Sequence, residues 1–340
     1  MLDGSRRALD GQVTSGLEPN VTYLHYPVSL RDRLLEGLAR IETPFAMLCS
    51  DDEFMVPTTV LKCMGFLKEH PTYNVCCGRL IAFAWNGRGL DLYPKKVGHA
   101  SHQVDQPTAI DRLRYHLGQY QVTTIYGVHR SDSLRFCLGN ALSRPWTNAY
   151  AAEMMAEILA AAKAKSAVLS SPSWIRSDEN QPVDSPDVGR AVSIDEWFAT
   201  PGGQIRHEFV EVAAQAIAKL GVVAEDEARR CLASLIEGRV ARWQDAAGRR
   251  PARWGRARLR VRQTAAFRVA RTLYRSMSGR QTDNTPDYFE SAGKFKLRAF
   301  ALEHGVSFDD DIVNDLRWIF TMVVEFHQRS QPTGPSGVVL

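Results

Sequence analysis

The feature that most restricts the fold is an alternation of strand and helix patterns between residues 21 and 85. Val21–Tyr26, Phe45–Cys49 and Asn74–Trp85 are rich in β-branched, aromatic and other apolar residues, as strands are. Leu30–Ile41 and Thr58–Lys68, which separate them, place apolar residues at helical spacing. The order β–α–β–α–β predicts a layered α/β domain with a mostly parallel sheet. Phe45–Cys49 is apolar throughout, which indicates a strand buried on both faces.

The rest of the chain is mainly helical in pattern. We expect a strand at Val122–Val128 and helices at Ile110–Leu117, Ala149–Lys165, Ile205–Lys219, Glu225–Trp243, Arg256–Ser276 and Asp310–Arg329. Ser170–Val188 is rich in serine, proline and aspartate, which is typical of a long loop or a domain boundary. We therefore expect an α/β domain over residues 1–188 and a mainly α-helical C-terminal region over residues 189–340.

Composition excludes several classes of protein. Hydrophobic residues make up 44% of the chain and charged residues 24%, as in ordinary globular proteins, so general disorder is excluded. No apolar stretch reaches the roughly 18–20 residues that a membrane-spanning helix needs. The six cysteines form no CxxC pair with histidine partners, which argues against a structural zinc site. Several of them lie in apolar runs, which favours a reducing cytoplasm over a disulfide-rich secreted domain.

A cluster of acidic residues, Ser50-Asp51-Asp52-Glu53, directly follows the apolar run Phe45–Cys49. Ligands of open α/β sheets bind at the carboxyl ends of the strands, so we expect Asp51 and Asp52 to project into a ligand crevice. Carboxylates are hard oxygen ligands, suited to Mg²⁺ or Mn²⁺. Such an ion would neutralise the charge on a departing nucleoside diphosphate. The alternative interpretation is a solvated acidic turn that caps the helix after Pro57.

The segment Thr43–Phe54, followed by Pro57, resembles the core of a bacterial group of glycosyltransferases related to the family-two enzymes. In that group a TPY-apolar-DDDF-P segment, a DXD-like motif, carries the metal-binding aspartates. Gly65–Tyr73 is similar to its usual continuation, a helix end and a strand that leads to a glycine, here Gly78. Tyr126–Arg130 is similar to a later strand end. The resemblance covers about residues 1–180 and is most specific in its first segment.

This resemblance implies a GT-A fold, which is Rossmann-like, with a UDP-linked nucleotide sugar as donor, Mg²⁺ or Mn²⁺ as cofactor, and inversion at the anomeric carbon. Asp52 would be the principal metal ligand, and Asp51 would contact ribose or phosphate. Glu53 stands where the group often has a third aspartate. Asp3 is similar to an acidic residue that lies near the nucleoside at the end of the second strand. The acceptor would be a glycan, a lipid-linked glycan or a protein.

The beginning of the chain departs from that family. If Asp3 ends the second strand, the first strand and the loop that holds the base would precede Met1. One explanation is a true start upstream of Met1, which we adopt as the hypothesis. The other is an incomplete nucleotide pocket, in which case the chain would be a catalytically silent GT-A-like binding or scaffold protein.

An inverting transfer also requires a general base that removes the proton of the acceptor hydroxyl. Glu153 is the candidate, because the family carries an acidic residue on the corresponding helix and Glu153 lies near the start of Ala149–Lys165. Asp132 and Glu157 are rivals. The alternative is that Glu153 is an ordinary solvated carboxylate on a helix face.

Two further charged segments have simpler explanations. Arg239–Arg280 is rich in arginine and almost free of acid, and Arg256–Arg275 has the pattern of a basic amphipathic helix. We rank a solvated face or subunit contact first and a peripheral contact with an anionic inner membrane second. Nucleic-acid binding ranks third, because no binding motif accompanies the charge.

Asp309-Asp310-Asp311 is expected to cap the last helix rather than to bind a metal. His99 and His102 are interpreted as surface or hydrogen-bonded histidines.

Overall fold

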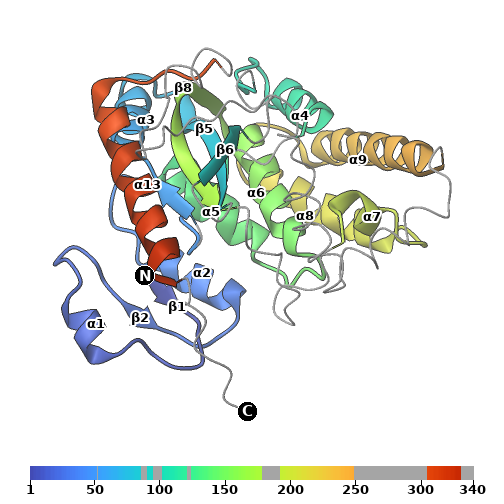
Figure 1. Ribbon diagram of the computed structural model, residues 1–340. Coiled ribbons are helices and arrows are strands. Elements are labelled where there is room, and N and C mark those ends of the chain that lie inside the picture. Colours follow the sequence, from blue (N-terminus) through green and yellow to red (C-terminus); the bar gives the residue numbers. More distant parts are fainter. Residues whose placement is uncertain are drawn as a thin grey trace.

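The computed structural model describes residues 1–51, 53–85, 90–94, 102–120, 124–177, 192–248 and 305–330, arranged as in Figure 1. The strands are β1 (Leu2–Asp3), β2 (Leu24–His25), β3 (Phe45–Ala46), β4 (Glu53–Met55), β5 (Tyr73–Trp85), β6 (Leu90–Pro94), β7 (Val128–Arg130) and β8 (Lys165–Ser177). The helices are α1 (Gly11–Ser15), α2 (Leu30–Ala39), α3 (Pro57–Glu69), α4 (Ala109–Gly118), α5 (Ser131–Ala141), α6 (Ala149–Lys163), α7 (Ile194–Phe198), α8 (Gln204–Ala218), α9 (Glu225–Gly248) and α13 (Asp310–Ser330). The fold is therefore of the mixed α/β class.

The strands form two sheets. β1 and β2 pair in parallel as a small separate sheet beside α2. The larger sheet has the order β3-β7-β5-β8-β4, and β6 pairs with β5. In this sheet β5 and β8 are parallel, whereas β3–β7, β5–β7, β5–β6 and β4–β8 are antiparallel.

The expectation of a mostly parallel sheet is thus wrong for the described strands, which form a mixed sheet. A parallel pair requires a crossover of about a dozen residues or more, usually a helix. The expectation counted only strands separated by such helices. It omitted the short strands β4 and β7, which run antiparallel to their neighbours at the edges of the β5–β8 pair.

Ser170–Ser177 forms the second half of β8, and the prediction of a loop there is wrong. Because β8 lies between β5 and β4, backbone pairing on both sides overrides the local preference of serine and proline. Pro172 lies where the register between β5 and β8 shifts, and there the Gly78 amide donates to the Ser173 hydroxyl at 2.8 Å. A Cβ atom on Gly78 would lie 2.2 Å from the Ser171 carbonyl oxygen, so glycine is required. Residues 178–188 of the expected loop lie outside the described residues.

The strand predicted at Val122–Val128 is also mostly wrong, because the described residues 124–127 form a turn and β7 begins only at Val128. The Gly127 amide closes this turn by donating to the Thr124 carbonyl oxygen at 2.9 Å. Gly127 packs tightly on β5, since a Cβ atom there would lie 2.9 Å from Val75 Cγ1. An alternation of apolar residues does not distinguish such a turn from a strand.

The predicted helices within the described residues are confirmed, with small shifts at their ends, as α2, α3, α4, α6, α8, α9 and α13. The basic helix Arg256–Ser276 lies outside the described residues. α5 is a helix that the sequence patterns did not predict. Among the described helices, none combines the length and the apolar character needed to cross a bilayer.

One hydrophobic core joins helices from both halves of the chain. α6 packs against α4, α5 and α8, and α9 packs against α4 and α8 (Figure 1). The buried members include Met154 and Leu159 of α6, Phe209 of α8 and Leu232 of α9. The boundary expected after residue 188 lies outside the described residues, but the helices before and after it share this core.

α13 (red in Figure 1) covers a second cluster on the large sheet. The Asp309 carboxylate accepts a hydrogen bond from the Ile312 amide at 3.0 Å, so the predicted N-terminal cap is confirmed. Another carboxylate, that of Asp315 on α13, accepts a hydrogen bond from the Thr58 amide of α3 at 2.8 Å and so joins the two helices. The apolar face of α13 buries Ile312, Leu316, Ile319, Phe320 and Val323.

Candidate functional site

The acidic segment forms a tight turn between β3 and β4. The Glu53 amide donates to the Ser50 carbonyl oxygen at 3.3 Å, and the Ser50 amide lies 3.4 Å from a Glu53 carboxylate oxygen. Asp51, at the corner of this turn, is exposed, whereas Asp52 lies outside the described residues. The turn therefore presents at least one carboxylate outward.

Neither Asp51 nor Glu53 of the acidic turn caps α3. The residue before the helix, Val56, provides no side-chain cap, and Pro57 has no amide hydrogen to be satisfied. The amide of Thr58 is instead satisfied by Asp315 of α13. The capping part of the alternative interpretation thus lacks support in the described residues, whereas the exposed Asp51 agrees with its other part, a solvated acidic turn.

Glu53 differs from Asp51 because its carboxylate is turned inward. Its side chain is only 1% exposed. β4 and β8 pair Glu53 with Arg176, and the Arg176 Nε atom lies 3.7 Å from Glu53 Oε1. Glu53 therefore fixes the shape of the turn and the position of Arg176, and it does not offer a carboxylate to the solvent.

The predicted base, Glu153, lies on α6 and is partly buried. The Tyr126 hydroxyl donates to Glu153 Oε1 at 3.2 Å. The Tyr126 ring stacks on Trp174 of β8, with ring centroids 4.3 Å apart, and Trp174 is paired with Met55 of β4. A continuous set of contacts therefore leads from Glu153 to the strand that follows the acidic turn.

The pKa of Tyr126 indicates which charges surround this hydroxyl. Burial raises the pKa of Tyr126, the charges of Glu153 and Glu53 raise this pKa further, and the charge of Arg176 opposes them. Carboxylates from the acidic turn and from α6 thus act on the same hydroxyl. The structure brings together the predicted base and the segment that holds the predicted metal ligands.

The rival Glu157 lies one turn further along α6 and is fully buried. One carboxylate oxygen accepts from the amides of Thr124 at 2.6 Å and Ile125 at 2.8 Å, and the other lies 3.2 Å from His116 Nε2. Burial alone would raise the pKa of Glu157, but His116 and the two amides lower it to about 2. Glu157 is therefore a structural carboxylate that holds the turn leading to Tyr126.

Histidines extend this buried polar cluster. His116 Nδ1 lies 3.0 Å from His102 Nε2, so His102 is a hydrogen-bonded histidine, as interpreted from the sequence, while His99 lies outside the described residues. His129 Nε2 donates to the Thr124 carbonyl oxygen at 2.7 Å. Burial lowers the pKa of both His102 and His129 to about 4, so both rings are neutral at pH 7.

Two other sequence candidates lie apart from this cluster. The exposed side chain of Asp132 forms an ion pair with Lys163 at 3.2 Å. Lys163 is ten residues beyond Glu153 on α6, a rise of about 15 Å, so Asp132 is not close to Glu153. Asp3 lies on β1, where it accepts hydrogen bonds from Tyr23 and from the Ser5 amide at 2.8 Å, which lower the pKa of Asp3 to about 2. No hydrogen bond or ion pair within the described residues joins Asp3 to the acidic turn.

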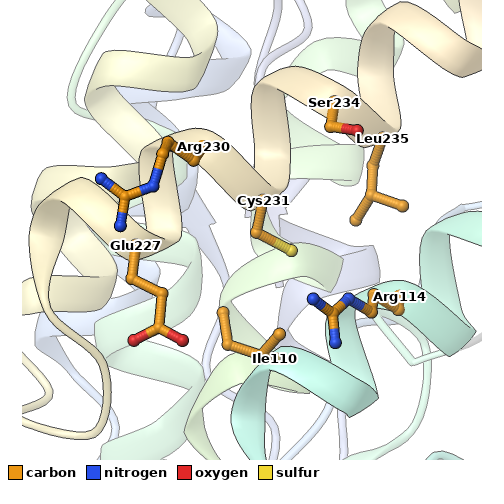
Figure 2. Close-up of a pocket in the computed structure, with 7 residues that line it drawn as sticks. All are labelled: Ile110, Arg114, Glu227, Arg230, Cys231, Ser234 and Leu235. Carbon is orange, nitrogen blue, oxygen red and sulfur yellow. The ribbon is translucent and has the colours of Figure 1, made fainter.

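A cavity of about 260 Å³ lies between α4 and α9 (Figure 2). It contains none of the residues of the cluster around Tyr126. Figure 2 shows the Cys231 thiol between the two helices, with Ile110 and Arg114 approaching from α4. The cavity is lined by Ile110, Arg114, Glu227, Arg230, Cys231, Ser234 and Leu235.

The donors at the acidic turn are of the type that suits a hard divalent ion. No group of three or more His, Cys, Asp or Glu side chains within the described residues could hold a metal by itself. Mg²⁺ is usually held by one or two carboxylates together with substrate phosphates and water, so a complete protein cage is not required. Asp52, the expected principal metal ligand, lies outside the described residues, Asp51, expected to contact ribose or phosphate, is exposed beside it, and the Glu53 carboxylate is turned inward.

Three residues of this site were not predicted from the sequence: Tyr126, Trp174 and Arg176. Tyr126 could have been found, because it begins the segment Tyr126–Arg130 that resembles the glycosyltransferase group. Trp174 and Arg176 lie in the segment taken for a loop, and only the pairing of β4 with β8 brings them to the acidic turn.

Comparison with known proteins adds no assignment. The chain matches no protein-family model. No curated protein matches it. The function must therefore be argued from the site itself.

Proposed function

We propose that this chain is a metal-dependent glycosyltransferase that moves a sugar from a UDP-linked donor to a hydroxyl of a glycan, lipid-linked or protein acceptor. The observation that supports it is the Tyr126 hydroxyl, which donates to Glu153 while lying in the field of Glu53. A general base and a segment with adjacent aspartates are the two elements that such a transfer requires, and here they share one site.

In this proposal Asp51 and Asp52 hold Mg²⁺ or Mn²⁺ together with the diphosphate of the donor. The ion, when bound, would supply positive charge next to the leaving group. Asp51 is suited to this role because it is exposed at the corner of the turn. Glu53 keeps the turn closed through the Ser50 amide and so orients the two aspartates.

Glu153 removes the proton of the acceptor hydroxyl. The acceptor oxygen forms a bond to the anomeric carbon as the bond from that carbon to the diphosphate oxygen breaks, and the electron pair remains on the diphosphate. The attack takes place on the face opposite the leaving group, so the configuration inverts. Tyr126 donates to one oxygen of Glu153 and so orients the carboxylate.

The finer assignment of the fold belongs to the same proposal. The described strands and helices are mixed α/β, which a GT-A domain would be. The expectation that Phe45–Cys49 is a strand buried on both faces is wrong, because only Phe45–Ala46 pairs among the described residues, as the partly buried edge strand β3. A cytoplasmic location, with peripheral membrane contact through Arg239–Arg280, would suit a lipid-linked acceptor. Most of that basic segment lies outside the described residues.

The test is binding and turnover with nucleotide sugars. Thermal-shift titration with UDP should raise the melting temperature in the presence of Mn²⁺, and Asp51→Asn and Asp52→Asn should remove most of this shift. Hydrolysis of the matching UDP-sugar in the absence of acceptor should then be slow but measurable. Metal-dependent UDP binding without any hydrolysis or transfer would favour the silent binding protein. Failure of UDP to bind, with or without Mn²⁺, would overturn the UDP-linked donor, and failure of GDP and dTDP as well would overturn the whole proposal.

A further inference from the structure

Arg176 is the cation that the sheet places next to the acidic turn. It lies at the end of β8, paired in register with Glu53 of β4. Its Nε atom lies 3.7 Å from the Glu53 carboxylate, and 40% of its side chain is exposed, against 1% for that of Glu53. The Nε side of the guanidinium therefore faces the buried Glu53, while part of the arginine side chain is open to solvent.

Arg176 donates no hydrogen bond within the described residues, and its Nε atom approaches the Glu53 carboxylate at 3.7 Å. A guanidinium presents its donors as a planar fork that matches the oxygens of a phosphate in two parallel hydrogen bonds. Because the Nε edge faces Glu53, the outer fork is the part that remains for a ligand. This geometry suits a phosphate group that approaches from the solvent side of β4 and β8.

The charges of the site also require a cation here. Asp51, Glu53 and Glu153 are acidic, and a nucleoside diphosphate that approaches them is repelled unless positive charge compensates. Arg176 is close enough to the same site to oppose the two glutamates in their effect on the pKa of Tyr126. A bound divalent ion would provide part of the compensation, and an arginine fork would provide the rest together with a fixed orientation.

We propose that Arg176 binds the phosphate groups of the nucleotide donor and that Glu53 is the positioning residue that holds its guanidinium. This inference rests on the proposed function and adds to it the residue that contacts the leaving group. The guanidinium of Arg176 acts as a hydrogen-bond donor only. Its role is to bind the diphosphate on which the electron pair remains.

The experiment compares a nucleotide with its nucleoside on the full-length chain. UDP, GDP and dTDP are titrated by calorimetry in the presence of Mn²⁺, and the nucleoside of the one that binds is measured by ligand-observed NMR. Arg176→Gln should weaken binding of the diphosphate by roughly 10- to 100-fold, the loss typical of a charge-assisted hydrogen bond. Binding of the nucleoside should stay unchanged, because it has no phosphate to lose.

Two further variants separate charge, geometry and folding. Arg176→Lys keeps the charge but not the fork, so it should recover only part of the affinity. Arg40→Gln is the matched control, because Arg40 also contacts a carboxylate, Glu36, through its Nε atom, at 2.6 Å, but on α2. This control should bind the diphosphate like the unmodified chain.

The outcomes distinguish the two proposals. If the unmodified chain binds none of the three nucleotides, the proposed function fails and the role of Arg176 fails with it. If it binds one of them in an Asp51-dependent way and Arg176→Gln binds it equally well, only the inference on Arg176 is overturned. Equal losses for nucleotide and nucleoside would also overturn it, since they would indicate a general distortion of the site.

Discussion

Glu153 and Glu157 lie one turn apart on α6 and show how burial divides two identical side chains between structure and chemistry. Glu157 is fully buried and is surrounded by two backbone amides and a histidine. Glu153 is partly buried and accepts one hydrogen bond from a tyrosine at 3.2 Å. The two carboxylates therefore differ in burial and in the groups that contact them, although they are one turn apart on the same helix.

The two carboxylates are also connected through the chain segment Thr124–Tyr126. Glu157 holds the turn at Thr124 and Ile125, and the next residue, Tyr126, contacts Glu153. The buried cluster around Glu157 therefore positions Tyr126 for its contact with the partly buried Glu153. Substitutions of the two carboxylates should therefore have different effects.

The largest expected effect is on catalysis at Glu153. Glu153→Gln should lower the rate of sugar transfer by roughly 100- to 10,000-fold, because the variant has no base for the acceptor proton. The free energy of unfolding should change by less than about 1 kcal/mol, since the amide keeps an oxygen for Tyr126. Initial rates with the matching UDP-sugar and urea denaturation measure the two quantities. A transfer rate within threefold of the unmodified chain would show that Glu153 is not the base.

Glu157 should show a large effect on stability. Glu157→Ala should lower the free energy of unfolding by about 3–5 kcal/mol, because a buried histidine and two buried amides lose their partner. Glu157→Gln, which can still accept from the amides, should lose less. Urea denaturation with the Glu153 variants as controls provides the measurement. If Glu153→Ala and Glu157→Ala were equally destabilising, the comparison between the two positions would be wrong.

The buried histidines should make stability depend on pH. His129 has an ordinary pKa of 6.5 and a folded pKa of about 4, so folding favours its neutral form. Its contribution is complete above pH 6.5 and is lost as the pH falls through 4. The loss amounts to up to about 3 kcal/mol, from roughly 1.4 kcal/mol per pKa unit.

His129→Gln provides the test of that dependence. Denaturation curves at pH 7 and pH 4 should show a smaller loss of stability in the variant than in the unmodified chain. His102→Gln should behave in the same direction, because burial also lowers its pKa to about 4. If the variant and the unmodified chain lost equal amounts of stability between pH 7 and pH 4, the fold would not be holding these histidines neutral.

The smallest expected effect is that of removing the Tyr126 hydroxyl, which contacts Glu153. Tyr126→Phe removes the hydrogen bond to Glu153 and keeps the ring that stacks on Trp174. The free energy of unfolding should fall by only about 0.5–1.5 kcal/mol. The rate of transfer should fall more than this value suggests, and its dependence on pH should shift, since the carboxylate loses a donor. An unchanged pH profile would show that Tyr126 does not influence Glu153.

The sequence predicted the parts of this molecule that depend on local pattern. α2, α3, α6, α8 and α13 follow from apolar periodicity, and β5 follows from its long apolar run. The cap at Asp309 also follows from local chemistry. The patterns failed at β8, where Pro172 and its serines suggest a loop, because the hydrogen bonds that make it a strand come from β5 and β4.

The site was predicted in part for the same reason. Asp51 and Glu153 were named from the sequence, but nothing local indicates that Tyr126 contacts Glu153. The separation of Glu153 from Glu157 is likewise absent from the sequence, where both are glutamates on the same helix. It depends on residues 124–125 folding back onto α6, and that is a tertiary contact.

The core around α6 has a consequence for how this protein can vary. Within the described residues, α8 and α9 lie against the same apolar core as α4 and α5, so these two helices do not form a separate module. A chimera that exchanged residues 189–340 for those of a distant sequence would leave Met154 and its neighbours against an unmatched surface. Natural or designed variants must therefore change both sides of this contact together, and the geometry of Glu153 changes with them.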